Sequence, residues 1–258
     1  MKVTIQKTFR KLKREGKKAF IPYIMAGDPD LERTKDIVHL FEECGADIVE
    51  LGVPFSDPLA DGPTIQQASE RALKNGVTLR KVVELVKRLS HEIRIPIVLM
   101  TYYNPVFKYG IELFISDARE AGIDGVIIPD LPPDEAAEFI ILSKNSHLNT
   151  IFLLAPTSTE DRIKKVVKAS TGFIYYVSIT GITGSDLLLD GSMQVLISNI
   201  RKYTDKPIAV GFGVSTPEEA SAVAKISDGV IVGSAIVKRL HNAPDELKQY
   251  LSSIREAI

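Results

Sequence analysis

The stretch DIVELGVPFSDPLADGP, residues 47–63, joins a short apolar run to a loop that is rich in proline and glycine. A nearly continuous apolar run such as DIVELGV is typical of a strand buried on both faces, as in a parallel sheet. The following residues contain too many turn formers to be regular. The stretch therefore predicts a buried strand that ends in an irregular loop, with Glu50 near the end of the strand.

Runs of the same kind recur along the chain and alternate with charged segments of helical periodicity, such as LERTKDIVHLFEECG and EDRIKKVVKAS. This alternation predicts βα units and a parallel sheet. The eight apolar runs occupy residues 20–27, 47–53, 95–104, 125–130, 150–156, 173–180, 207–214 and 229–237.

Eight βα units in 258 residues match the (β/α)₈ barrel in number and length. A doubly wound open sheet is the alternative, but it usually has fewer strands and a clearer nucleotide fingerprint, and no G-x-G-x-x-G follows the first run. Residues 64–76 and 78–93 look like two successive helices, so we expect extra helices around the barrel. No linker divides the chain, and residues 1–258 are expected to form a single barrel domain.

Composition argues against several classes of partner. Lys and Arg number 32 and Asp and Glu 33, so the formal net charge is −1, and no basic stripe suggests nucleic acid or an anionic membrane. The single cysteine, Cys44, cannot form an internal disulfide and is expected in the core of a protein from a reducing compartment. No apolar run approaches the roughly 18 residues of a membrane span, so we expect a cytoplasmic protein.

Glu50 is the first candidate for chemistry. Side chains alternate along a strand, so Ile48 and Glu50 share one face, and Glu50 lies in the barrel mouth if Ile48 points inward. A partly desolvated carboxyl has a raised pKa and can act as acid and base near neutral pH. The alternative is a structural acid paired with a cation, but the strand interiors offer almost no Lys or Arg.

Two long connections follow strand ends, at 54–63 and 178–192, and are candidate lids, although insertions are also tolerated there. Asp57, before Pro58, is interpreted as a turn residue. Asp61 either serves the turn or faces the mouth beside Glu50. Glycine clusters at 180–184, 211–213 and 232–238 follow three neighbouring strands, and together they indicate a phosphate site built from backbone amides.

Other chemistries lack their residues. The four histidines, His39, His91, His147 and His241, fall in helices or connections, and no cluster has metal-ligand spacing, so no metal is expected. No lysine ends a strand interior, which argues against a Schiff base. Carboxylate acid/base chemistry on an apolar, phosphorylated substrate remains. Side chains at strand ends that could wall the pocket are Tyr23, Leu99, Tyr102, Ile128, Tyr175 and Phe212. For any one of them alone, a place in the core is the better interpretation.

The motif ELGVPFSDPLADGPTIQ, with GDP (27–29), TYYNPVF (101–107), TGITG, GFGVSTPEE and VGSAIVK, resembles the tryptophan synthase alpha subunit family over nearly the whole chain and in the same order. The resemblance implies a (β/α)₈ barrel that cleaves indole-3-glycerol phosphate to indole and glyceraldehyde 3-phosphate. It also implies that Glu50 and Asp61 are catalytic. The substrate-binding residues that we expect are Tyr23, Tyr102, Tyr175, Thr183, Gly184, Phe212, Gly213, Gly233 and Ser234.

Within that set, the resemblance assigns the phosphate to Gly184, Gly213, Gly233 and Ser234, and it assigns a closing lid to Thr183. Two positions depart from some members of the family: Tyr23 stands where they have Phe, and Ile179 where they have Arg. The first could change pocket polarity, and the second puts the contacts of the lid in doubt.

The resemblance further implies a partner. The chain itself should need no cofactor, and a beta chain that carries pyridoxal phosphate should complete an alpha2beta2 complex, with Asp57 as a candidate contact. Another phosphate-binding barrel, such as a sugar-phosphate isomerase, is the alternative enzyme, and the first motif argues against it. A regulatory subunit that has lost catalysis is the alternative of another class, and the presence of both Glu50 and Asp61 argues against that.

Overall fold

The computed structural model describes residues 3–177, 191–211 and 213–258. Its strands are all parallel and hydrogen-bond in the order β5-β4-β3-β2-β1-β9-β8-β7-β6. Their bounds are β1 Ala19–Met25, β2 Val49–Gly52, β3 Ile97–Met100, β4 Gly125–Ile127, β5 Asn149–Ile151, β6 Leu153–Leu154, β7 Ile174–Val177, β8 Ile208–Gly211 and β9 Gly229–Val232.

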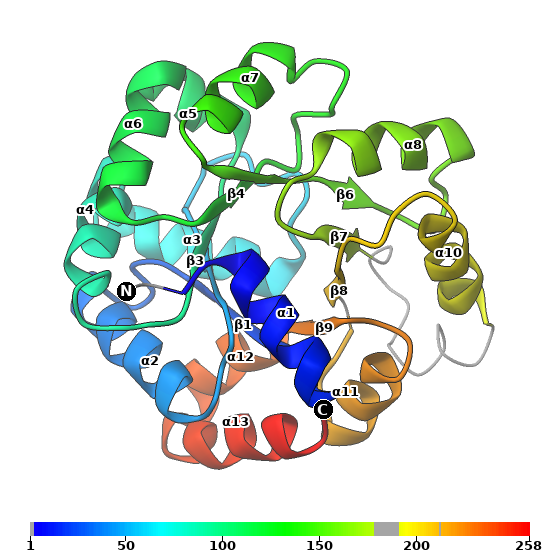
Figure 1. Cartoon of the computed structure of the whole chain (residues 1–258). Helices are drawn as coiled ribbons and strands as arrows, with labels where there is room; N and C mark the ends of the chain where they lie inside the picture. The colour runs from blue at the N-terminus through cyan, green and yellow to red at the C-terminus, as the bar shows by residue number, and fades with distance from the viewer. Residues whose placement is uncertain (1–2, 178–190, 212) are drawn as a thin grey trace.

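The first and last strands of this order, β5 and β6, come from one extended segment of the chain, residues 149–154. β5 and β6 are consecutive and are separated only by Phe152, so the sheet curls into a nearly closed ring (Figure 1). Each of the eight apolar runs contains a strand, and the run at 150–156 is split between β5 and β6. The predicted barrel is confirmed, and the open doubly wound sheet is wrong, because such a sheet would keep two distant edge strands.

Helices surround this ring in Figure 1. Two of them, α3 and α4, connect β2 to β3 as predicted, and α5 and α6 both lie between β3 and β4. The bounds are α1 Ile5–Glu15, α2 Leu31–Glu43, α3 Pro63–Lys74, α4 Leu79–Leu89, α5 Tyr103–Tyr109, α6 Ile111–Ala121, α7 Ala137–Asn145, α8 Glu160–Ala169, α10 Ser192–Arg201, α11 Pro217–Ala224, α12 Ser234–Asn242, the 3₁₀ turn η1 Pro244–Glu246 and α13 Leu247–Glu256.

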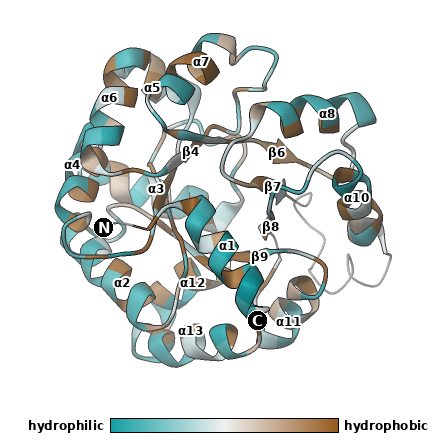
Figure 2. Ribbon diagram, viewed as in Figure 1, coloured by the Kyte–Doolittle hydropathy of each residue, from teal (hydrophilic) through white to brown (hydrophobic). Residues whose placement is uncertain are grey.

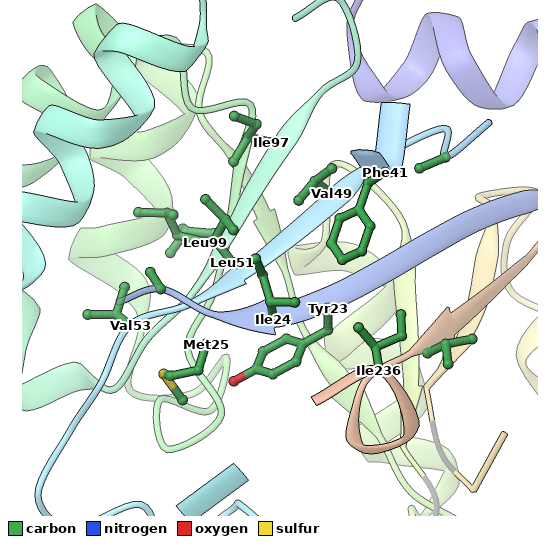
Figure 3. Packing of buried hydrophobic residues seen from close by; sticks show 14 of the residues in the cluster. Tyr23, Ile24, Met25, Phe41, Val49, Leu51, Val53, Ile97, Leu99 and Ile236 are labelled. Atoms are coloured by element: carbon green, nitrogen blue, oxygen red, sulfur yellow. The ribbon is translucent and has the colours of Figure 1, made fainter. Parts of the chain in front are cut away.

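The strands are buried on both faces, which explains their continuous apolar sequences. One apolar layer separates the strands from the helices and contains Val49, Leu51 and Leu99, whose packing Figure 3 shows. A second cluster fills the inside of the ring and contains Ile48, Val98 and Ile127. In Figure 2 the strands are mostly brown, whereas teal is common on the helices around them. The alternation of faces therefore positions every strand side chain.

Helix α1 covers the centre of the ring in Figure 1. Its N-cap Thr4 accepts a hydrogen bond from the Lys7 amide, and its buried Phe9 joins the inner cluster. The Phe9 and Phe173 ring centroids are 5.8 Å apart. Since a barrel interior must be filled rather than left as a pore, α1 completes the inner core at the end of the barrel that lies away from the strand C-termini.

We expect Phe9→Ala to lower the free energy of unfolding by about 3–5 kcal/mol, because it leaves a cavity where an aromatic ring fills the inner core. Urea unfolding followed by circular dichroism measures this change. The matched control is Lys13→Ala, at an exposed position of the same helix, for which we expect a change within about 0.5 kcal/mol. Equal effects of the two substitutions would show that α1 does not contribute to the barrel core.

Candidate active site

Glu50 lies in β2 with its side chain on the inner face of the ring. It is in register with Tyr23 of β1 and Val98 of β3, and Ile48 belongs to the inner cluster, as the alternation predicts. Glu50 is only 1% exposed, and neither carboxyl oxygen has a hydrogen-bond partner among the described residues. Burial, and then the nearby Asp61 carboxylate, raise the pKa of Glu50 to about 8. The side chain is therefore mostly protonated at neutral pH.

Asp61 lies in the loop that joins β2 to α3. The loop is tightened around it, since its amide donates to the Pro58 carbonyl at 3.0 Å and its carbonyl accepts from the Gln66 side chain at 2.9 Å. Burial raises the pKa of Asp61 to about 6, and a hydrogen bond from the Tyr102 hydroxyl opposes that rise. Asp61 is therefore mostly ionised at neutral pH.

Asp57 differs from Asp61 in its surroundings. It is exposed, its carboxylate accepts from the Ser56 hydroxyl at 2.7 Å, and its carbonyl accepts from the Leu59 amide at 2.9 Å. These contacts confirm the interpretation of Asp57 as a turn residue. It is not among the residues that line the cavity described next.

A cavity of about 500 Å³ opens at the C-terminal ends of the strands. Glu50 from β2 and Asp61 from the following loop both line it. Of the other site residues expected from the sequence, those that line the same cavity are Tyr23, Tyr175, Gly213, Gly233 and Ser234. The barrel thus brings together side chains that are separated by up to about two hundred residues of chain.

Two phenol rings lie across glycines at the cavity wall. A Cβ on Gly52 would stand 2.1 Å from the Tyr23 hydroxyl oxygen, and a Cβ on Gly211 would stand 2.3 Å from that of Tyr175. Glycine at both strand ends therefore makes room for the tyrosines. Burial raises the pKa of both phenols, and the Glu50 and Asp61 carboxylates raise it further. Both rings are neutral groups that can donate a hydrogen bond within the cavity.

The glycine-rich side of the cavity offers backbone donors. Gly213 has a φ of 65°, a left-handed conformation that favours glycine. Helix α12 begins at Ser234, and its N-cap Gly233 provides no side-chain cap. The first amide groups of a helix have no intrahelical acceptors and carry partial positive charge, so they can bind an anion.

A buried charged cluster holds the flanking helices. Asp28, after β1, is 3% exposed and accepts two bonds of 2.8 Å from Arg71 of α3 and one contact of 2.9 Å from His241 of α12. The paired geometry to the guanidinium is the strong form of this interaction. Asp28 therefore ties the helix that follows Asp61 to the helix that starts at Ser234.

The prediction that Leu99 and Ile128 wall the pocket is wrong. Leu99 and Ile128 belong to the outer apolar layer, and their neighbours Met100 and Pro129 line the cavity instead. Side chains alternate between the two faces of a strand, and Val98 and Ile127 face inward. The inward positions that follow them are therefore 100 and 129, not 99 and 128.

The remaining predicted residues are placed as follows. Tyr102 is buried but is not among the lining residues; its hydroxyl accepts from the Ala60 amide at 3.0 Å and contacts Asp61. Thr183, Gly184 and Phe212 lie outside the described residues, as does Ile179.

Sequence reasoning missed Arg162 of α8, which lines the cavity together with Ser158. The segment EDRIKKVVKAS was interpreted as a charged helix without further role. The available signal was position: the first turn of a helix that follows a barrel strand lies near the C-terminal face. In the part of the chain that the structure describes, no group of three or more His, Cys, Asp or Glu could hold a metal, and no helix could span a membrane.

The raised pKa of Glu50 predicts a pH-dependent stability. Between about pH 4.5 and 8 the folded chain keeps a proton that the unfolded chain releases, so stability falls as pH rises through this window. Glu50→Gln removes this dependence. From pH 5 to pH 9 the variant should gain roughly 2–4 kcal/mol relative to the parent chain, as measured by urea unfolding.

Asp57→Asn is the matched control, because Asp57 is exposed. Its free energy of unfolding should change between pH 5 and pH 9 by the same amount as that of the parent chain. Parallel stability curves for the parent and Glu50→Gln would contradict the burial of an unpaired carboxyl.

Comparison with known proteins identifies the family of this chain. Residues 9–257 match the family model described as tryptophan synthase alpha chain. The curated tryptophan synthase alpha chain of Geobacter sulfurreducens is 50% identical over 97% of this chain and 97% of its own length. That of Caldanaerobacter subterraneus subsp. tengcongensis is 46% identical over 98% of this chain and 99% of its own length.

Solved structures agree as well. Tryptophan synthase subunit alpha from Legionella pneumophila str. Paris superposes with a TM-score of 0.91 at 38% identity, covering 98% of this chain and 97% of that chain. A chain of Mycobacterium tuberculosis tryptophan synthase gives a TM-score of 0.93 at 36% identity, covering 100% and 99%. On sequence and fold, the chain belongs to the tryptophan synthase alpha chain family.

Proposed function

We propose that Glu50 is the acid and base of this site and that Asp61 stabilises the positive charge that develops on the substrate. The reaction is that of the family: the chain is a lyase of tryptophan biosynthesis that cleaves indole-3-glycerol phosphate to indole and glyceraldehyde 3-phosphate. The observation that carries the two roles is that one cavity holds two carboxyls whose pKa values are separated, at about 8 for Glu50 and about 6 for Asp61.

The chemistry needs this separation. Breaking the carbon–carbon bond to indole C3 is a retro-aldol step, and C3 must first accept a proton, which places positive charge on the ring nitrogen. Protonated Glu50 supplies that proton, and ionised Asp61 accepts the ring N–H and stabilises the charge. Glu50, then ionised, takes the proton of the glycerol hydroxyl as the bond breaks, so that it ends the cycle protonated again.

The phosphate of the substrate binds at the glycine-rich wall of the cavity in this proposal. Gly213 and the start of α12 at Gly233 and Ser234 present backbone amides there, and the left-handed Gly213 allows a close approach. Thr183, Gly184 and Phe212 are proposed to complete the site, on the family resemblance alone. The buried Ile231 and the partly buried Met100 are apolar side chains of the lining that would meet the indole ring.

We expect Glu50→Gln to reduce kcat for cleavage by at least about 10² to 10⁴-fold, the usual contribution of a general acid or base. The amide is nearly isosteric but cannot donate and recover the proton. Asp61→Asn should also be severely impaired, because an amide accepts the ring N–H without matching its charge. Release of indole by the isolated chain measures both effects.

Asp57→Asn, in the same loop, is the matched control and should retain most of the activity of the isolated chain. A Glu50→Gln variant with more than about a tenth of the parent rate would refute its role as general acid and base. Similar losses at Asp57 and Asp61 would show that the assignment of Asp61 is wrong.

We also propose that the chain pairs with a tryptophan synthase beta chain, the pyridoxal phosphate subunit, in an alpha2beta2 complex. One support is the exposed apolar surface near the site: Leu59, in the loop of Asp61, is 94% exposed, and Phe107 of α5 is 63% exposed. In the same loop, Pro54 is buried and Phe55 packs on Tyr102 with ring centroids 5.1 Å apart. Leu59 is thus the apolar side chain that this loop presents to a partner.

Adding a matching beta chain should raise the rate of cleavage by about 5- to 150-fold, the range of typical allosteric coupling. Leu59→Ser should weaken the binding of the two chains several-fold in calorimetry. The control Ile141→Ser, at an exposed apolar position of α7, should not. Binding without a rise in cleavage would contradict the coupling, and unchanged binding of Leu59→Ser would contradict the proposed contact.

A further inference from the structure

Arg162 is a cation in the lining of the cavity that contains Glu50 and Asp61. It stands in the first turn of α8, and it is the lone Lys or Arg among the described residues that line the cavity. Its side chain is partly buried. Within the described ranges its guanidinium forms no hydrogen bond or ion pair, and only its backbone amide is engaged, by the Thr159 cap.

The neighbouring acids do not neutralise Arg162. Glu160, on the same turn, contacts Lys164 at 2.6 Å and accepts from the Tyr203 hydroxyl at 2.6 Å. Asp161 is exposed to solvent. Lys165, three residues along the helix, pairs with Asp134 at 3.0 Å and does not line the cavity. No partner among the described residues therefore keeps the Arg162 guanidinium from binding a ligand that enters the cavity.

The charges of the site call for a cation of this kind. A phosphorylated substrate enters a cavity that already contains the ionised Asp61, and the backbone amides proposed for phosphate supply only partial charges. A guanidinium remains charged at all working pH values and presents several donors to a phosphate. We propose that Arg162 is a substrate-binding residue that attracts the phosphate dianion into the cavity and offsets its repulsion by Asp61.

This inference rests on the proposed phosphate-binding role of the cavity, but it is independent of the roles given to Glu50 and Asp61. It can therefore be tested by binding alone. The probes are glycerol 3-phosphate, which carries the dianion, and indole, which carries no charge. Calorimetry on the full chain gives the Kd of each probe.

Arg162→Gln should raise the Kd of glycerol 3-phosphate about five- to tenfold, in the range expected for the loss of one partly exposed, charge-assisted contact. The Kd of indole should not change. Arg162→Lys should restore part of the loss because it keeps the charge. Added salt should reduce the difference in glycerol 3-phosphate affinity between the parent and Arg162→Gln, because salt screens the attraction between the guanidinium and the phosphate.

Lys165→Gln is the matched control, three residues along the same helix and already paired with Asp134, and it should bind both probes as the parent does. The proposal is overturned if Arg162→Gln binds glycerol 3-phosphate as tightly as the parent does. It is also overturned if the substitution weakens the binding of both probes equally, because that would show a change in pocket shape. The third contrary result is that the parent chain does not bind glycerol 3-phosphate. Loss of turnover in the Glu50 or Asp61 variants leaves these readouts unaffected.

Discussion

A carboxyl group that is buried with no hydrogen-bond partner among the described residues constrains the rest of this barrel. In those surroundings ionised Glu50 would be poorly solvated, so the fold keeps it protonated and tolerates the raised pKa. Its position depends on register. Val49 and Leu51 are buried in the outer layer on the other face of β2, and a slip of one residue would drive the carboxyl into that apolar layer. Burial on both faces of the strand therefore places Glu50 in the mouth.

The two carboxyls of the site differ because their surroundings differ. Glu50 is part of a buried strand and accepts no hydrogen bond from the described residues, whereas Asp61 is part of a loop, is partly exposed and accepts a bond from Tyr102. Desolvation raises both pKa values, but the donor to Asp61 limits its rise. The same fold thus provides a proton donor and an anion within one cavity at neutral pH, with no need for a cation between them.

The sequence predicts best where burial on both faces constrains it. The eight apolar runs locate every strand, and alternation from Ile48 places Glu50 on the inner face. Alternation fails where the starting face is unknown, as for Leu99 and Ile128, which point outward. Contacts between loops also escape local pattern: nothing in the sequence around Tyr102 shows that its hydroxyl meets Asp61. Arg162 resembles any exposed helix residue until the barrel places it at the cavity.

The loop of Asp61 is fixed at its two ends and exposed in its middle. At one end the Phe55 amide and carbonyl both bond to the Ser69 hydroxyl of α3 at 2.9 Å, and α3 is held in turn by the bond from Arg71 to Asp28. At the other end the Ala60 amide bonds to Tyr102.

The segment between those two ends carries Leu59, which is 94% exposed. Asp61 lies directly after Ala60, so the position of its carboxylate depends on the hydrogen bond from the Ala60 amide to Tyr102. A partner that covers Leu59 therefore acts on the position of Asp61 and on its bond from Tyr102. Glu50 belongs to β2, which is hydrogen-bonded to β1 and β3 and is not part of this loop. A loop tethered in this way offers a physical route by which docking at the surface can alter one carboxyl of the pair and leave the other unchanged.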